Sequence, residues 1–175
     1  MELCQISHQL SSSPKRFSDC CLAISNTLIA QLAAILPKKP KFTLSVGSGS
    51  GFLEGLLAYS EASCSVQGVE VDSSINRYIA EEDMHVVGGG WGLHADAQHA
   101  TAWMFVYPRD PKLVAKYIDA YGDQAVEMIV WLGPRVDWED YEPCFRASPF
   151  SALSFLDNVG LAPYETMVVA RNRRD

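Results

Sequence analysis

The sequence predicts an α/β protein, a three-layer sandwich in which helices cover both faces of a mostly parallel, truncated sheet of six to seven strands. Strand-like and helix-like segments alternate from residue 40 onward, which is typical of a parallel sheet. Two of the strands, 102–107 and 126–132, are apolar along nearly their whole length, as expected where helices cover both faces. A glycine-rich turn at 47–51 joins the first strand of this region to the first helix.

Residues 1–39 form an N-terminal segment with one amphipathic helix, and residues 40–175 form the sheet-containing domain. Ser13-Pro14 can cap and open a helix over 14–36, because proline is favoured at the first helical position. Apolar residues recur there at helical spacing, at Phe17, Cys21, Ile24, Leu28, Leu32 and Ile35. The prolines of 37–40 end this helix.

The larger domain is predicted to continue through ten elements. In order they are strand 42–46, helix 51–60, strand 65–71, helix 74–82, strand 85–87, strand 102–107, a helix from Pro111 to about Tyr121, strand 126–132, helix 149–158 and strand 164–170. Capping residues support these boundaries. Asp72, Ser73 or Ser74 can cap the helix over 74–82, and Asp110 can cap the helix that Pro111 opens. Ser148-Pro149 has the same pattern.

Composition limits the classes of function. The 175 residues are 48% hydrophobic and 20% charged, which is ordinary for one globular domain. The net charge of -7 argues against a nucleic-acid partner, which needs a basic face. No apolar run approaches the ~20 residues of a membrane span. Five scattered cysteines and the lack of an export signal predict a cytoplasmic protein.

The turn at 47–51 carries the main functional signal. Gly47, Gly49 and Gly51 alternate with serines between a strand and a helix, which leaves backbone room for a nucleotide and directs the helix N-terminus at it. Glu70 ends the next strand, about 20 residues on, where a carboxylate can accept hydrogen bonds from the ribose hydroxyls of an adenine nucleotide.

These motifs resemble those of the class I S-adenosylmethionine-dependent methyltransferases, across about residues 40 to 170. The family's first loop reads as an acid, an apolar residue and then Gly-x-Gly-x-Gly. Here the acid is replaced by Ser45, followed by Val46 and the glycines. The ribose-binding acid of the family matches Glu70, and its adenine-side acid matches Asp96. The resemblance implies a Rossmann-like fold with S-adenosylmethionine as cofactor.

The implied cofactor-binding residues are Gly47, Ser48, Gly49, Gly51, Glu70, Val71, Asp96 and Ala97. Trp91 or His94 could form a wall beside the adenine. Purely structural roles remain open for each part: the glycines can serve the turn alone, Glu70 can cap the following helix, and Asp96 can be a surface acid. A dinucleotide fingerprint fits less well, because Phe52 occupies the position of its third glycine.

Catalytic residues are less well defined. In amino-group methylases of this family an acid or amide precedes the proline after the fourth strand, and Tyr107 stands there instead. Tyr107 and Arg109 are candidates to contact substrate, and Tyr107, His94 and His99 are weak candidates for catalysis. No metal site is expected, because His94, Asp96 and His99 are close only along a loop.

The sequence therefore predicts an S-adenosylmethionine-dependent methyltransferase acting on a small-molecule acceptor, with homo-oligomerisation possible. The alternative is a non-catalytic subunit that binds S-adenosylmethionine or S-adenosylhomocysteine with the same fold. A nucleotide-dependent reductase is a third candidate, which the position of the third glycine opposes.

Overall fold

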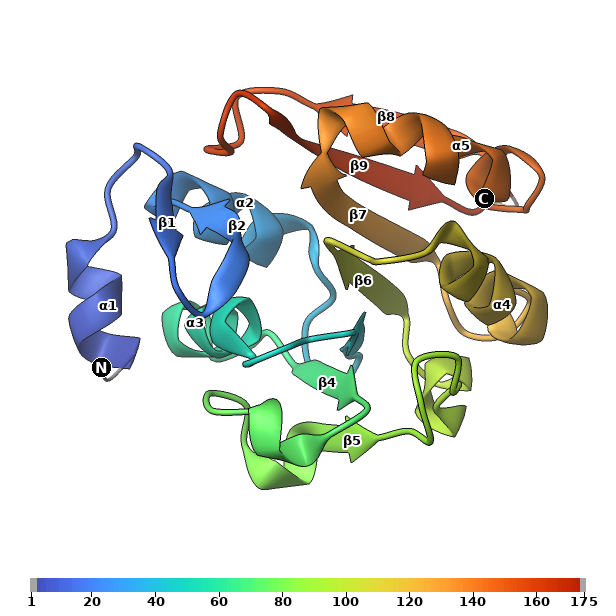
Figure 1. The fold of residues 1–175 in the computed structure, drawn as a ribbon, viewed down its shortest axis with the longest axis horizontal. Coiled ribbons are helices and arrows are strands. Elements are labelled where there is room, and N and C mark those ends of the chain that lie inside the picture. The colour runs from blue at the N-terminus through green and yellow to red at the C-terminus, as the bar shows by residue number, and fades with distance from the viewer. Residues whose placement is uncertain (1–2, 174–175) are drawn as a thin grey trace.

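The computed structural model describes residues 3–173, and a seven-stranded sheet forms its centre (Figure 1). The order of the strands is β5-β4-β3-β6-β7-β9-β8, and β9 is antiparallel to both of its neighbours. The strands of this sheet are β3 (Thr43–Val46), β4 (Val66–Glu70), β5 (Met84–Val86), β6 (Ala102–Val106), β7 (Met128–Pro134), β8 (Ala152–Leu156) and β9 (Glu165–Arg171). The fold class is therefore as the sequence predicts, with the sheet at the upper end of the expected size.

The strand order places a switch point at the centre of the sheet. The chain runs outward from β3 through β4 to β5, then crosses back to β6 and continues to β7. The connections leaving β3 and β6 thus diverge to opposite sides. In open α/β sheets the ligand crevice lies outside the carboxyl ends of the strands at such a point. The turn at 47–51 follows β3, so the sequence motif falls at this position.

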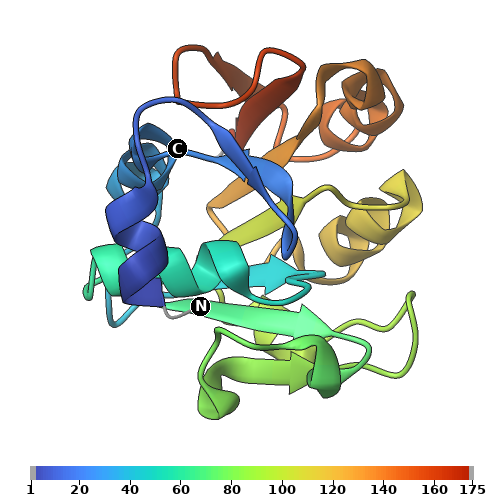
Figure 2. The same ribbon diagram turned by 60° about the vertical axis from the view of Figure 1, so that its left-hand side comes forward.

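Helices cover the two faces in separate groups (Figure 2). One face carries α1 (Leu3–Gln9), α2 (Asn26–Ile35) and α3 (Phe52–Ser60), and the other carries α4 (Pro111–Tyr121) and α5 (Trp138–Arg146). Each group closes its own apolar core, with Leu28 and Leu56 fully buried in the first and Tyr117 and Phe145 fully buried in the second. Both faces of the central strands are consequently buried, which explains their continuous apolar sequences.

The N-terminal segment differs from the single helix predicted over 14–36. It begins with the helix α1 and continues in a hairpin of β1 (Lys15–Phe17) and β2 (Cys20–Ile24); within the predicted range 14–36 only Asn26–Ile35 is helical, as α2. Ser25 caps that helix by accepting a hydrogen bond from the backbone N–H of Leu28. The apolar spacing that suggested a longer helix arises because the buried residues of β2 lead directly into the buried face of α2. The division of the chain at residue 39 remains a prediction.

The C-terminal region contains two elements that the sequence prediction did not include. Residues 138–146 form α5, although Pro143 lies inside this helix. Residues 152–156 form β8, whereas a helix was predicted over 149–158. The prediction was wrong there because Ser148-Pro149 resembles a helix start. Ser148 in fact closes a turn, since its hydroxyl donates to the carbonyl of Phe145 and accepts from the N–H of Phe150.

The segment after β4 also differs from the prediction. In place of a helix over 74–82 there are two short 3-10 turns, η1 (Ser73–Ile75) and η2 (Glu81–Asp83). The backbone N–H groups of Arg77 and Tyr78 donate to the carbonyl of Ser50. Because these hydrogen bonds hold the segment against the glycine turn, it does not form a helix. Among residues 3–173, no helix has the length and apolar character needed to cross a membrane.

Candidate functional site

The glycine turn takes backbone conformations that explain its composition. Gly47, Gly49 and Gly51 all have positive φ angles, of 74°, 59° and 74°, which L-residues with side chains rarely adopt. A Cβ atom placed on Gly47 or Gly49 would meet no atom within 4 Å. A Cβ on Gly51 would lie 2.5 Å from Cγ1 of Ile79. The first two glycines therefore border open space, while the third is required by packing.

Glu70 meets the same turn, as the sequence predicts. Its Oε1 accepts a hydrogen bond from the backbone N–H of Gly49 at 2.6 Å, and its Oε2 accepts from the N–H of Val71 at 3.1 Å. An ionised carboxylate offers about four acceptor positions, so two remain for a ligand. Val71 follows Glu70 and has 46% of its surface exposed. The two sequence motifs thus converge at the carboxyl ends of β3 and β4.

A second carboxyl group lies behind the turn, and the sequence analysis did not identify it. Glu54, in the first turn of α3, is only 3% exposed, and its Oε1 accepts a hydrogen bond from the hydroxyl of Ser45 at 2.6 Å. Burial raises the pKa of Glu54 to about 7, and the charge of Glu70 adds to this shift. The only sign in the sequence was an acid within an otherwise apolar helix.

The hairpin of β1 and β2 lies against the start of α3. The hydroxyl of Ser50 donates to the backbone carbonyl of Asp19, and the hydroxyl of Tyr78 donates to the Asp19 carboxylate at 2.8 Å. The rings of Phe17 and Phe52 pack with their centroids 5.0 Å apart. Burial, followed by the charge of Glu54, raises the pKa of Cys20 to about 12, so this thiol stays protonated.

The far side of the hairpin is fixed by Glu165, the first residue of β9. Its fully buried carboxylate accepts from the backbone N–H groups of Ala23 and Ala162 and from the hydroxyl of Tyr107 at 2.7 Å. Tyr107 follows β6 and has a positive φ of 48°, which is unusual for a residue with a side chain. The hairpin therefore extends from the glycine turn, at Ser50, to the region beyond β6.

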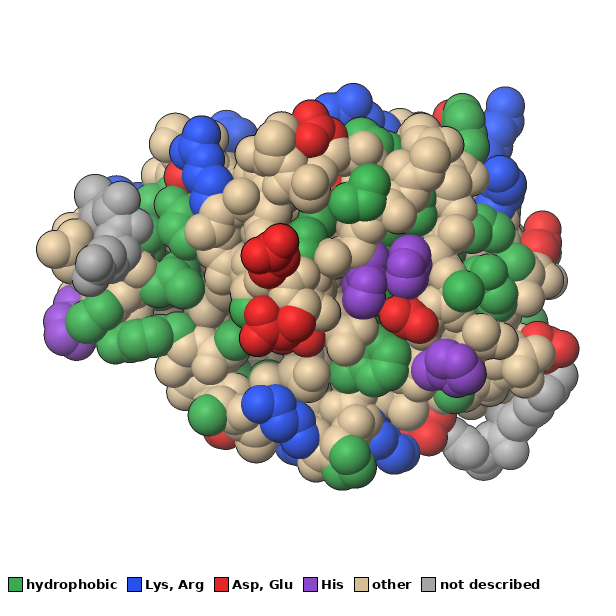
Figure 3. Space-filling model, turned by 90° about the horizontal axis from the view of Figure 1, so that it is seen from below, with side chains coloured by type: hydrophobic (Ala, Val, Ile, Leu, Met, Phe, Trp, Pro, Cys, Tyr) green, Lys and Arg blue, Asp and Glu red, His purple; other side chains and the backbone are tan. Residues whose placement is uncertain are grey.

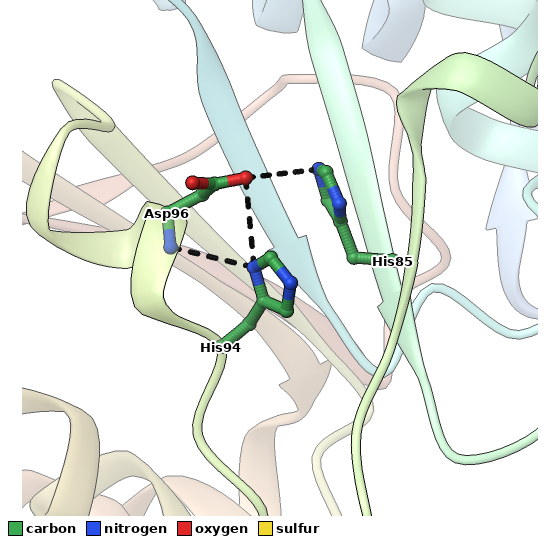
Figure 4. Close-up of side chains that lie close together, drawn as sticks. All are labelled: His85, His94 and Asp96. Carbon is green, nitrogen blue, oxygen red and sulfur yellow. Dashed lines mark hydrogen bonds and ion pairs between the residues drawn. The ribbon is translucent and has the colours of Figure 1, made fainter.

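Asp96 lies in a cluster with two histidines. Its Oδ2 is 3.6 Å from Nε2 of His85 and 3.7 Å from Nδ1 of His94 (Figure 4). The two imidazole rings stack with centroids 4.3 Å apart. Figure 3 shows histidine side chains gathered beside an acidic one on the side of the molecule where β5 forms the edge of the sheet. The sequence analysis considered His99 together with His94 and Asp96. In the structure His99 is exposed, and the second histidine beside Asp96 is His85, on β5.

The other candidate residues occupy varied positions. Ala97 is fully buried in the core beneath α4, and its carbonyl accepts from the indole N–H of Trp103. Trp91 is 48% exposed in the loop after β5. Arg109 is also exposed and directly precedes Asp110, the residue that caps α4. The structure thus brings together Gly49, Glu70 and Val71 directly, whereas the role of the other residues stays a prediction.

The fold is similar to that of solved Rossmann-fold proteins, several of which are named as methyltransferases. A protein of the NADB-Rossmann superfamily from Streptococcus agalactiae aligns at 18% identity and a TM-score of 0.55, over 85% of this chain and 68% of its own. The methyltransferase SibL, solved in its apo form, aligns at 16% identity and a TM-score of 0.62, over 85% of this chain and 54% of its own.

The methyltransferase domain of bacterial CtHen1 aligns at 13% identity and a TM-score of 0.61, over 83% of this chain and 95% of its own. Other structural neighbours carry the names of a 23S rRNA methyltransferase and of human N-acetylserotonin methyltransferase in complex with SAM. No protein-family model and no curated protein matches the sequence. The shared property is therefore the fold, among proteins whose named acceptors are diverse.

Proposed function

We propose that this chain is an S-adenosylmethionine-dependent methyltransferase. The observation that carries the proposal is the 2.6 Å hydrogen bond between the N–H of Gly49 and the carboxylate of Glu70. It brings the glycine turn and the acid of the next strand to one point, beside the open space at Gly47 and Gly49 and next to the switch point of the sheet. A glycine turn, an acid that faces it and open space beside both are the features that an adenosine site requires.

In this proposal Glu70 binds the ribose. Two acceptor positions of its carboxylate remain beyond the bonds to Gly49 and Val71, and a ribose diol offers two donors. Val71 provides an exposed apolar surface beside the adenine. Asp96 accepts from the adenine amino group with the carboxylate oxygen that does not face the histidines. The N–H of Ala97 donates to the carbonyl of His94, so Ala97 offers the adenine no free N–H.

The residues behind the turn would face the methionine part of the cofactor. Bound S-adenosylmethionine supplies a sulfonium methyl group for in-line transfer to a nucleophile. Ser45 and Glu54 fix the base of the turn by their hydrogen bond, and the hairpin excludes water from this side through its contacts with Ser50 and Glu165. Catalysis then depends mainly on alignment of acceptor and methyl group.

We infer a small-molecule acceptor. The net charge of -7 opposes binding to a polyanion, which relies on clustered Lys and Arg. The hairpin is held at its turn by Ser50 and near the end of β2 by Glu165, and in this proposal it limits the size of an acceptor that approaches from the β6 side. In this proposal the ring of Tyr107, which follows β6, contacts the acceptor.

A non-catalytic cofactor-binding subunit is the second candidate, and Tyr107 favours it. Its hydroxyl is committed to Glu165, and burial followed by this hydrogen bond raises the pKa of Tyr107 well above its ordinary value. Tyr107 therefore keeps its proton near neutral pH and supplies no general base.

Calorimetry separates the candidates. The methyltransferase and the binding subunit both predict binding of S-adenosylmethionine and S-adenosylhomocysteine without binding of NADPH, and loss of binding in Glu70→Ala. Turnover with hydroxyl, amine and thiol acceptors, and with RNA as a separate arm, then distinguishes the enzyme from the binder. Tight binding of NADPH alone would overturn the proposal.

A further inference from the structure

The cluster of His85, His94 and Asp96 has features of a metal site. His85 comes from β5, whereas His94 and Asp96 come from the loop and the 3-10 turn η3 (Ala95–Gln98), which lies between β5 and β6. One ligand atom from each residue lies within 4.8 Å of the other two. The chain brings them together from either side of the glycine-rich loop 87–92.

The spacing of these atoms matches coordination chemistry. Zinc binds His nitrogen and carboxylate oxygen at about 2.0–2.2 Å, so two ligands at tetrahedral to trigonal angles are separated by roughly 3.3–3.7 Å. The separations of Asp96 Oδ2 from Nε2 of His85 and from Nδ1 of His94 are 3.6 and 3.7 Å. An ion at these distances requires the two rings, which stack with centroids 4.3 Å apart, to turn so that the lone pair of each nitrogen points at it.

We propose that His85, His94 and Asp96 form a binding site for a divalent transition metal ion, with Zn²⁺ as the ion that fits the donor set. Two imidazole nitrogens and one carboxylate oxygen leave a fourth position for water. The amide oxygen of Gln67, 2.9 Å from Nε2 of His85, accepts the N–H of that ring in the metal-free protein, and a bound ion would take the place of this proton. Mg²⁺ and Ca²⁺ prefer oxygen ligands alone and are not expected to bind.

The ring nitrogens that would bind the ion already have partners in the metal-free protein. The backbone N–H of Asp96 donates to Nδ1 of His94 at 3.3 Å, and a bound ion would replace this long hydrogen bond, because Nδ1 has a single lone pair. Neutral imidazole is the form that binds metals.

A bound ion would join β5 to the segment that follows the loop 87–92. That loop contains Gly88, Gly89 and Gly90, which have the largest conformational freedom to lose on folding. Asp96 is 42% exposed at its side chain, so an ion can reach the site from solvent. Zn²⁺ is therefore expected to raise the melting temperature and to slow proteolysis of this loop.

The test uses the full chain after treatment with a chelator, titrated with Zn²⁺ in calorimetry against a competing chelator of known affinity. We expect one saturable site, with affinity lowered more than tenfold in His94→Ala and in Asp96→Asn. Asp96→Asn keeps the shape of the side chain and guards against misfolding, which circular dichroism checks in both variants. His99→Ala, an exposed histidine three residues away, is the matched control and should bind like the parent.

Co²⁺ as a probe tests the donor atoms. Nitrogen and oxygen ligands give visible bands without the intense near-ultraviolet band of a thiolate ligand. A thiolate band, equal affinity in the parent and both variants, or unsaturable uptake of Zn²⁺ would each overturn the proposal. Binding to a pair such as Cys20 and Cys21 would be recognised by the first of these results.

Discussion

Ser45 donates its hydroxyl hydrogen to Glu54 across 2.6 Å, so the strand before the glycine turn is joined to the first turn of the helix after it. Ser45 stands where the resembled family has an acid. A carboxyl group nevertheless lies beside Ser45: Glu54 supplies it from α3, nine positions further along the chain, and it is buried behind the turn.

The raised pKa of Glu54 predicts a pH-dependent stability. An ordinary value of 4.5 in the unfolded chain and about 7 in the folded chain mean that the folded state binds more protons between these values. Unfolding free energy should consequently fall as pH rises from about 4.5 to about 7, by roughly 3 kcal/mol. Urea unfolding of the parent at several pH values measures this slope.

Glu54→Gln is the comparison for that slope. Glutamine keeps an acceptor for the Ser45 hydroxyl but carries no ionisable group, so the difference between the variant and the parent should grow with pH and level off above about pH 7. Parallel pH profiles for the two proteins would show that Glu54 ionises normally.

Removing Glu70 should abolish the ribose contact. Two charge-assisted hydrogen bonds contribute about 1.5–3 kcal/mol each, so Glu70→Ala should weaken S-adenosylhomocysteine binding by at least about tenfold in calorimetry. Asp72→Ala provides a control two residues on, because Asp72 is exposed and caps only η1. Equal losses in both variants would indicate a general change at this edge of the sheet.

Substitutions at the glycines of the turn should distinguish a position that borders the proposed ligand from one that packing requires to be glycine. Gly49→Ala should lower stability by only about 1–2 kcal/mol, the cost of a left-handed residue, because nothing lies within 4 Å of the new methyl group. Its cofactor affinity should fall much further, because the methyl group enters the space proposed for adenosine. Gly51→Ala should lose more stability, because its methyl group meets Ile79.

Gly88→Ala is the control for this series, since it also has open space around the new methyl group and lies outside the turn. Thermal unfolding and calorimetry on the same samples give both quantities. Normal binding by Gly49→Ala would place the cofactor elsewhere.

Removing the carboxylate of Glu165 should lower the free energy of unfolding more than removing the hydroxyl of Tyr107 does. Glu165→Ala leaves the N–H groups of Ala23 and Ala162 and the hydroxyl of Tyr107 without their buried acceptor, at about 1–3 kcal/mol each. We expect a loss of at least about 3 kcal/mol in urea unfolding. Tyr107→Phe removes one of these bonds and should cost about 1 kcal/mol. A similar cost for the two changes would argue against Glu165 as the common acceptor.

The centre of the fold could be predicted from sequence because each signal there was local. The apolar strand before Gly47, the alternating glycines and the acid at Glu70 lie within one strand-turn-helix-strand unit, and their geometry follows from backbone rules. Asp110 and Pro111 likewise marked the start of α4, where Asp110 caps the helix. These positions need no information from distant parts of the chain.

The errors fall where distant contacts decide the structure. Residues 15–24 form a hairpin because Asp19 and Ala23 find partners at Ser50 and Glu165, which no local pattern reveals. The helix α5 did have a local signal, because Trp138, Tyr141 and Phe145 recur at helical spacing, but Pro143 concealed it. The histidine cluster could not be found from spacing, since His85 lies nine residues from His94 and the loop sets their approach.

The position of Glu165 has a consequence for biosynthesis. Glu165 is the first residue of β9 and pairs with Pro134 at the end of β7, so it lies at the edge where the parallel strands end. Its carboxylate there accepts from the N–H of Ala23, 142 positions earlier in the polypeptide. During translation the first hairpin leaves the ribosome long before its anchor exists. The hairpin cannot form its hydrogen bond to Glu165 until almost the entire domain has emerged. Synthesis of β9 therefore completes the contacts on that side of the hairpin.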